Sequence, residues 1–345
     1  MTDTAPAGIA GRALLSVEEF RPLEGQVSSG EFQGPPPAGA APVRPDQASL
    51  SAGLLLGLVS LAGWSAYLIV ARHGALVGFQ PFDLAVARLA PAGIIFLPLI
   101  LRRGVGNLGG VGWRRGIILA MFGGPSFAFL MAGGFTFAPV THGSVVGPAT
   151  LTLMTTLLAI SFLGDRPTAL RYLGLAAIVA GIVLVGITAF QTAITGTILL
   201  GDFFFFIANV SFAIFTILLR KWEVPALPGA AAVTGISALV MLPIYAALAD
   251  YANLEQIGLA EFALQWLGQG VFTGCIATVC FMAAVQRIGP ARAAVFPSAI
   301  PASGVLLGGP LLGESTNTLQ LIGVAVTTLG LVMAIGLADQ WFRRR

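Results

Sequence analysis

Long runs without charge are the feature that most constrains how this chain folds. No charged residue occurs in residues 116–164 or in residues 172–201. A helix of about 20 apolar residues crosses the hydrocarbon core of a bilayer, so each run is too long for one crossing and must contain a turn. Turn-forming residues place the first turn in 137–144 and the second in 191–197. With 56% hydrophobic and 10% charged residues, the chain has too little polar surface for a soluble globule.

The apolar segments predict ten membrane-spanning helices. Their expected ranges are 50–70, 83–101, 116–137, 142–163, 171–190, 196–219, 228–249, 263–285, 292–312 and 318–338. Lys and Arg indicate the orientation, because cytoplasmic loops carry an excess of them. If the N-terminus is cytoplasmic, the outer loops hold Arg72 alone. The inner side then holds Arg102, Arg103, Arg114, Arg115, Arg166, Arg171, Arg220, Lys221, Arg287, Arg292 and the three C-terminal arginines. We therefore expect both termini in the cytoplasm.

Two segments, 140–186 and 289–336, repeat one another at an offset of 149 residues. The match includes a proline and the turn between two helices, which apolar composition alone does not dictate. It superposes Pro148 on Pro297, Leu163 on Leu312, and Asp165 on Glu314. Because each copy has five helices, an odd number, the second copy enters the membrane upside down. The expected fold is an all-α membrane protein of ten transmembrane helices in two inverted five-helix repeats, residues 49–190 and 196–338.

The two ends of the chain differ in composition from the rest. Residues 1–48 contain a PPP run, Gly-Pro-Ala clusters and charges of both signs, which predicts a disordered cytoplasmic tail. Residues 11–23 are also compatible with a short amphipathic helix on the membrane surface. No basic segment leads into an apolar one here, so a secretory signal is not expected. Residues 339–345 are expected to form a basic cytoplasmic C-terminus.

The residue patterns of several activities are missing. The one lysine, Lys221, follows arginine instead of glycine, so the chain has no phosphate-binding loop for ATP. His73 and His142 are the two histidines and no HExxH motif occurs. We therefore expect that the protein holds no catalytic metal and no cofactor, and that it is not an enzyme. Cys275 and Cys280 lie five residues apart and point in different directions on a helix, which disfavours a disulfide or a metal pair. The formal charge of +3 reflects membrane orientation and indicates no binding to nucleic acid.

Three polar side chains inside the expected spans are candidate solute contacts. An arginine near the centre of a spanning helix costs about 2.5–3.5 kcal/mol, so Arg88 is expected to pair with Asp83 or with an anionic group of a solute. Asp202 lies about two turns into its helix and can bind a proton or a substrate amine, or extend toward the surface. Asn209 lies seven residues further on the same face and would line the same cavity as Asp202.

Four aromatic residues are further candidates. Trp64 and Tyr67 are three residues apart, share a helical face and lie too deep for an interfacial aromatic belt. The repeat places Phe212 and Phe215 at the corresponding positions of the sixth helix. Two interpretations remain open. The four rings form facing walls around a solute with an apolar or cationic part, or they pack as ordinary contacts between helices.

The repeated prolines, Pro148 and Pro297, each leave a backbone carbonyl without its helical donor at matched depths. They are interpreted either as hinges beside a central cavity or as packing kinks. Matched small residues are expected at close helix contacts, namely Gly174, Gly181, Gly323 and Gly330. Asp165 and Glu314 are expected to cap the ends of the fourth and ninth helices.

Three segments of residues 50–338 resemble the EamA type of the drug/metabolite transporter superfamily. They are GPARAAVFPSAIPASGVLLGGPLLGE, its partial copy ending in LGDRP, and WSAYLIVAR in the first helix. The chain departs from the family at Asp165, where Glu is usual, and in its Pro-rich tail. The resemblance implies a secondary transporter that exports a small organic solute, such as an amino acid or a related metabolite, across a bacterial inner membrane. Members move amino acids, sugars, nucleosides and drugs, so the resemblance does not identify the solute. It also leaves open whether the protein forms a homodimer. The alternative is a membrane protein without transport, such as a lipid-handling or assembly factor.

Overall fold

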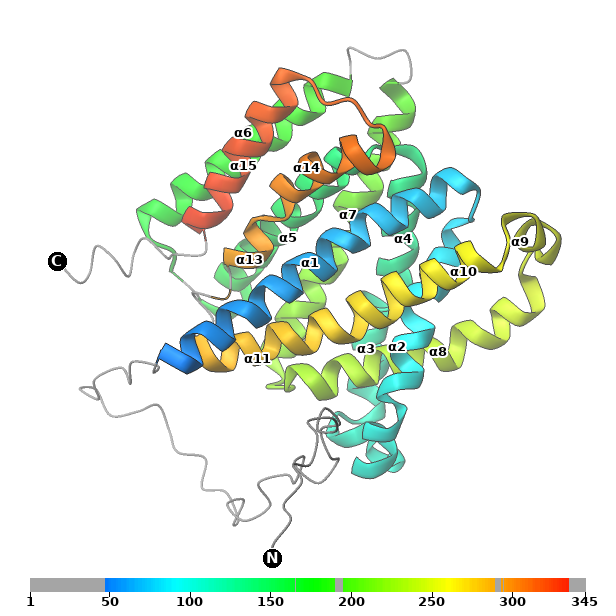
Figure 1. Ribbon diagram of the computed structural model, residues 1–345. Coiled ribbons are helices and arrows are strands. Elements are labelled where there is room, and N and C mark those ends of the chain that lie inside the picture. The colour runs from blue at the N-terminus through cyan, green and yellow to red at the C-terminus, as the bar shows by residue number, and fades with distance from the viewer. Residues whose placement is uncertain (1–46, 165, 190–194, 289–292, 294, 335–345) are drawn as a thin grey trace, which may run out of the picture. The chain divides into compact units, whose positions relative to one another are not determined.

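The computed structural model describes residues 47–164, 166–189, 195–288, 293 and 295–334. The expected N-terminal tail, apart from its last two residues, the basic C-terminus and most of the second turn lie outside this part of the chain. The described residues fold into helices joined by short connections, with no strand among them (Figure 1). The fold is therefore all-α.

The helices follow the apolar segments closely. Their bounds are α1 (Gln47–Val77), α2 (Pro81–Arg103), η2 (Val105–Gly110), α3 (Trp113–Gly123), α4 (Pro125–Phe137), α5 (Val140–Leu163), α6 (Ala169–Ala189), α7 (Thr195–Lys221), α8 (Ala226–Leu248), α9 (Tyr251–Ile257), α10 (Leu259–Gln265), η3 (Trp266–Ala277), α11 (Thr278–Ile288), α13 (Val295–Ser298), α14 (Ile300–Leu312) and α15 (Thr318–Ala334). Within the described ranges, eight stretches are long and apolar enough to cross a membrane, and α14 and α15 are apolar but shorter. The protein is an all-α membrane protein with eight helical stretches of spanning length where ten were expected.

Prolines explain why the expected ninth helix is broken. It divides at Ala299 into α13 and α14. In a continuous helix the ring of Pro301 would clash with the carbonyl of Pro297, four residues earlier, and Pro301 has no N–H to donate to it. In the first copy Thr152 stands at the position of Pro301, and α5 continues unbroken through Pro148. The matched prolines therefore sit in different local structures.

Two other expected helices are also irregular. The third is divided by Gly124 and Pro125 into α3 and α4, because Gly124 has φ −106° and ψ −119°, outside the helical region. The eighth runs from α10 through η3, a π-helical segment with wider turns, into α11. Polar side chains hold this span to α1: Gln265 Nε2 donates to the carbonyl of Val70 at 3.0 Å and Thr273 Oγ1 to that of Gly63 at 2.8 Å. Such bonds satisfy polar atoms that lipid cannot.

The last helices of the two copies, α6 and α15, pack backbone against backbone (Figure 1). A Cβ atom on Gly174 would lie 2.6 Å from the nitrogen of Ala334 and 2.8 Å from the carbonyl oxygen of Gly330. One on Gly181 would lie 2.8 Å from the carbonyl oxygen of Gly323. The helices are antiparallel. The repeat aligns Gly174 with Gly323 and Gly181 with Gly330, whereas in space Gly174 lies against Gly330 and Gly181 lies against Gly323. The expected role of these glycines in close helix contact is confirmed.

Candidate functional site

An ion pair joins distant segments where α1 ends and α5 begins. Nε of Arg72 lies 2.8 Å from Oε1 of Glu314, and the two side chains are 14% and 12% exposed. Arg72 Nη1 also donates to the carbonyl of Phe135 at 2.6 Å, and the N–H of Val140 donates to Oε2 of Glu314 at 2.8 Å. The carboxylate of Glu314 thus caps the start of α5, where the helix dipole favours negative charge, whereas it was expected to cap the end of its own helix. We call this side of the molecule, defined by Arg72, Glu314 and Val140, the bridged end.

A second polar pair at the bridged end joins α5 to α7. Nδ1 of His142 lies 3.0 Å from each carboxylate oxygen of Asp202. The histidine is buried, and the side chain of Asp202 is 16% exposed. Since α5 belongs to the first copy and α7 to the second, this pair also holds one copy against the other. Nothing in the sequence indicated a histidine partner for Asp202.

Aromatic rings fill the space next to these pairs. The buried ring of Phe135 has its centroid 5.9 Å from that of Tyr67 and 4.8 Å from that of Phe205, both in edge-to-face arrangements. A Cβ atom on Gly143 would lie 2.6 Å from the Phe135 ring and 2.9 Å from the Phe205 ring, so glycine leaves the room that these rings occupy. The bridged end therefore joins α1, α4, α5 and α7 by both polar and apolar contacts.

Arg88 projects from α2 toward rings on α1 and α4. Its guanidinium carbon lies 4.0 Å from the ring centroid of Tyr67 and 5.3 Å from that of Phe127. Contacts of this kind contribute about 0.5–2 kcal/mol. Nη1 of Arg88 is buried and has no hydrogen-bond partner among the described residues. The alternative in which Asp83 pairs with Arg88 is wrong: the Asp83 carboxylate accepts a hydrogen bond from the N–H of Gln80 at 2.8 Å and caps α2, where acidic groups are favoured.

The other candidate aromatics do not face one another as two walls. Trp64 packs on Phe281 of α11, with ring centroids 5.0 Å apart. Phe212 packs on Phe127 of α4 at 4.6 Å and on Phe215 at 5.0 Å. Phe215 is buried in a core shared with α2, α3 and α8. Phe212 therefore makes its ring contact with the first copy through Phe127, and not through Trp64 or Tyr67.

Asn209 lies buried where α7 approaches α4 and α5. Its Nδ2 donates to the carbonyl four residues earlier at 2.8 Å and lies 3.4 Å from Sδ of Met131. A Cβ atom on Gly147 would lie 3.3 Å from the same nitrogen. Pro148 therefore follows a glycine that leaves room for the Asn209 amide, whereas Pro297 lies in the short helix α13.

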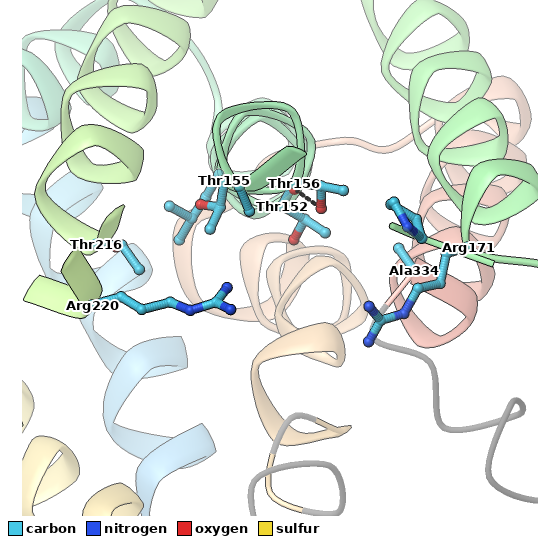
Figure 2. A pocket seen from close by; sticks show the side chains of 10 residues that line it. Thr152, Thr155, Thr156, Arg171, Thr216, Arg220 and Ala334 are labelled. Atoms are coloured by element: carbon cyan, nitrogen blue, oxygen red, sulfur yellow. Dashed lines mark hydrogen bonds between the residues drawn. The ribbon is translucent and has the colours of Figure 1, made fainter. Parts of the chain in front are cut away.

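A pocket of about 390 Å³ lies at the opposite end of α5 and α7 (Figure 2). It is lined by Leu151, Thr152, Thr155, Thr156, Ala159, Pro167, Arg171, Thr216, Arg220 and Ala334. In Figure 2 the three threonines of α5 face the space, and Arg220 from α7 and Arg171 from α6 approach it from opposite sides. None of these ten lining residues is acidic, although Asp165, two positions before Pro167, lies outside the described residues. We call this side the pocket end.

One face of α7 connects the pocket with the aromatic residues further in. Thr216 lies one turn after Phe212, and its Oγ1 donates to the Phe212 carbonyl at 2.8 Å. Arg220 follows one more turn along the same face. On α5, Thr152 likewise lies one turn after Pro148. Helices α5 and α7 are thus joined at the bridged end and line a pocket at the pocket end. The faces that line the pocket also carry Pro148 on α5 and Phe212 on α7, one turn deeper in the molecule.

Residues 51–187 and 199–336 each match the model of the EamA-like transporter family. The two stretches cover most of the chain and fall on its two copies. The chain belongs to the EamA-like transporter family. The resemblance to drug/metabolite transporters is therefore confirmed, and this EamA-like protein is a membrane transporter and not an enzyme.

A comparison of structures agrees with this membership at the level of the fold. A protein known from a crystal structure matches this EamA-like chain with a TM-score of 0.55 and 17% sequence identity, over 85% of this chain and 98% of the other. At this identity the likeness concerns the fold alone. No protein with a curated description matches the sequence.

The pocket of this EamA-like protein is the feature that sequence reasoning missed. Its signal is the row Thr152, Thr155 and Thr156, which lie close together on an otherwise apolar helix. The rule of positive inner loops explains Arg171 and Arg220 without any site. Their approach to one pocket depends on how α5, α6 and α7 pack, which no local pattern encodes.

Proposed function

We propose that this EamA-like protein is a secondary transporter that exports a small organic solute, such as an amino acid or a related metabolite, by alternating access. The observation that supports it is the difference between the ends of α5 and α7. The His142–Asp202 pair joins these helices at the bridged end, and both helices line a pocket at the pocket end. Transporters built from two inverted repeats expose a central site to either side by moving one half against the other.

The proposal keeps ten crossings, cytoplasmic termini and an inner-membrane location. In the second copy α14 and α15 take the places that α5 and α6 have in the first, and they would complete the ten. The antiparallel contact of α6 with α15 supports the inverted relation. With this topology the inner loops, and with them the pocket end, lie on the cytoplasmic side. Export then begins with a solute entering the pocket.

The proposed solute path continues from the pocket toward Arg88. Phe212 lies one turn beyond the pocket and contacts Phe127, which in turn lies under Arg88. Asn209 lies on the same side of α7, one turn further in. Pro148, next to the Asn209 contact, is the proposed hinge of α5, since its missing N–H leaves one carbonyl of the helix free.

Efflux from proteoliposomes tests this proposal. Vesicles containing the purified protein are loaded with a mixture of amino acids and related metabolites, and the external solution is analysed by mass spectrometry. We expect one class of solute to leave faster than from vesicles without protein. If no solute does so, transport of these compounds is refuted.

A disulfide between positions 65 and 303 tests whether transport requires α1 and α14 to move apart. Their Oγ atoms lie 2.8 Å apart and join α1 of the first copy to α14 of the second. In a protein with Cys275→Ala and Cys280→Ala, adding Ser65→Cys and Ser303→Cys should allow a disulfide on oxidation. We expect oxidation to stop efflux and reduction to restore it. Unchanged efflux from the oxidised protein would argue against alternating movement of α1 and α14.

A further inference from the structure

Two polar joints hold the copies together at the bridged end, and one of them can change its charge. Arg72 and Glu314 form the first joint, in which arginine always keeps its positive charge. His142 and Asp202 form the second, with Nδ1 of the ring 3.0 Å from each carboxylate oxygen. Histidine changes its charge between about pH 5 and 8, so the second joint can respond to protons where the first cannot.

We infer that His142 and Asp202 form a proton-binding site and that one bound proton keeps the bridged end closed. With the proton bound, the imidazolium ring and the carboxylate carry opposite charges and attract each other. Without it, the neutral ring still donates Nδ1–H to Asp202, but the attraction between opposite charges is lost. The inference rests on the proposed alternating access, because it names what regulates the opening of this end.

Burial makes the charge of this joint matter. The ring of His142 is buried, and the side chain of Asp202 is only partly exposed. A carboxylate beside a neutral ring leaves one net charge in a site of low polarity, whereas the ion pair has no net charge. Closing the end around the pair is therefore easier with the proton than without it. A ligand that is favoured in one form shifts the population toward that form, and here the ligand is a proton.

The helices packed against α5 bring few other titratable groups to the pair. Within their described residues, α4, α14 and α15 carry none. Helix α1 brings Tyr67, Arg72 and His73. Arg72 is paired with Glu314, tyrosine is neutral in this range of pH, and Nε2 of His73 lies 2.9 Å from Oε2 of Glu261. The other titratable groups of α6 and α7 belong to the turns at the pocket end, namely Arg171, Tyr172, Arg220 and Lys221. On the described parts of these helices, His73 is thus the one other residue whose type changes charge in the same range.

Distances between spin labels test the inference without a transported solute. In a protein with Cys275→Ala and Cys280→Ala, labels are attached at Leu76→Cys on α1 and Thr197→Cys on α7, two exposed positions in different copies. The full-length protein in nanodiscs is measured by pulsed electron paramagnetic resonance at about pH 5.5 and about pH 8.5. We expect the ratio of long to short distances to rise about tenfold at the higher pH, because a charged hydrogen bond is about twice as strong as a neutral one.

Variants assign the effect to the pair. His142→Gln keeps a donor for Asp202 but takes up no proton, so its distances should not change with pH. His73→Gln is the matched control and should keep the full dependence on pH. A dependence that survives His142→Gln, or that disappears with His73→Gln, would overturn the inference while leaving the movement of the proposed transport function intact.

Glu314→Gln makes the opening measurable where the closed form dominates. It loosens the first joint without altering His142, so the open population should increase and should still follow the pH. Equal ratios at both pH values in this background would overturn the inference. If no variant shows long distances under any condition, the bridged end does not open, which would overturn both the inference and the proposed alternating access.

Nuclear magnetic resonance measures the bound proton itself. With His73→Gln, His142 is the one histidine left in the chain, so isotope-labelled histidine reports on this ring alone in protein purified without a histidine tag. We expect the ring nitrogens to change from the charged to the neutral state between about pH 5.5 and about pH 8.5. A ring that keeps one state throughout this range would overturn the inference, whatever the spin labels show.

Discussion

Nε of Arg72 lies 2.8 Å from Oε1 of Glu314, although 242 positions of the chain separate the two residues. Arg72 stands near the end of the first helix and Glu314 follows α14, so the pair joins the first copy to the second. Separating partly buried charges leaves each without its partner in a site of low polarity, which is strongly unfavourable. The pair therefore favours the arrangement in which the bridged end stays together.

We expect Glu314→Gln to loosen the bridged end. The amide still accepts a hydrogen bond from Val140 but no longer neutralises Arg72. Thr141 is 3% exposed, so Thr141→Cys, in a protein without its native cysteines, should react slowly with a maleimide that cannot cross the membrane. Adding Glu314→Gln should raise that rate about tenfold, the effect of about 1.4 kcal/mol on opening.

The exposed residue Glu255 supplies the control for this labelling. Glu255→Cys lies in α9, outside the bridged contacts, and should react at the same rate with and without Glu314→Gln. Equal rates for Thr141→Cys in both backgrounds would show that the ion pair does not hold this end together.

The His142–Asp202 pair should contribute to stability. His142→Ala leaves the buried side of the Asp202 carboxylate without its donor, which we expect to lower the free energy of unfolding by about 1–3 kcal/mol. Asp202→Asn keeps an acceptor for Nδ1–H and should cost less. Thermal midpoints of the purified variants measure both effects beside Glu255→Gln, an exposed carboxylate. A midpoint of His142→Ala that matches that control would contradict the prediction.

Close contact between α6 and α15 should make one glycine sensitive and another tolerant. A Cβ atom on Gly181 would collide with Thr327 and with the backbone at Gly323, whereas one on Gly186, in the same helix, would meet no described atom within 4 Å. Gly181→Ala is expected to destabilise the protein by about 1–3 kcal/mol, and Gly186→Ala to leave it unchanged or slightly more stable. Size-exclusion profiles and thermal midpoints compare the two. Equal behaviour would show that the helices can move apart at little cost.

The contact of Arg88 with Tyr67 should depend on shape as well as on charge. Arg88→Lys keeps the charge but loses the planar group that lies over the ring, so we expect efflux to fall about 2- to 30-fold. Tyr67→Phe keeps the ring and should retain most activity, whereas Tyr67→Leu should lose it. Leu58→Ala, at an exposed position of α1, is the control for a shortened side chain in the same helix. Full activity of Tyr67→Leu would remove this contact from the mechanism.

Most helices of this protein could be predicted from sequence, because apolar length and turn-forming residues leave few alternatives. The fourth helix, expected at 142–163, is α5 at Val140–Leu163. Interruptions were harder to predict. Gly124 and Pro125 form a recognisable break signal, but the apolar residues on both sides suit a continuous helix equally well. The expected ninth helix breaks between Pro297 and Pro301, two prolines one turn apart. α5 has a single proline at the corresponding place, Pro148, and continues through it.

Partners across the molecule could not be predicted. Arg72 reads as a loop charge and Glu314 as a local cap until the copies are packed together. His142 and Asp202 lie 60 positions apart in segments that share no pattern. Where a polar side chain points in an apolar helix depends on the rotation and tilt of that helix, which packing against its neighbours sets.

The crossing of α6 and α15 has the symmetry of an interface between identical subunits, although it lies within one chain. If each copy were a separate chain, two identical chains in inverted orientation could make the same glycine contacts. Any substitution would then appear in both chains at once. Joining the copies in one chain removes that obligation. Each copy can change its sequence separately, as with Pro301 in the second copy and Thr152 in the first. The contact between α6 and α15 still holds the two copies together.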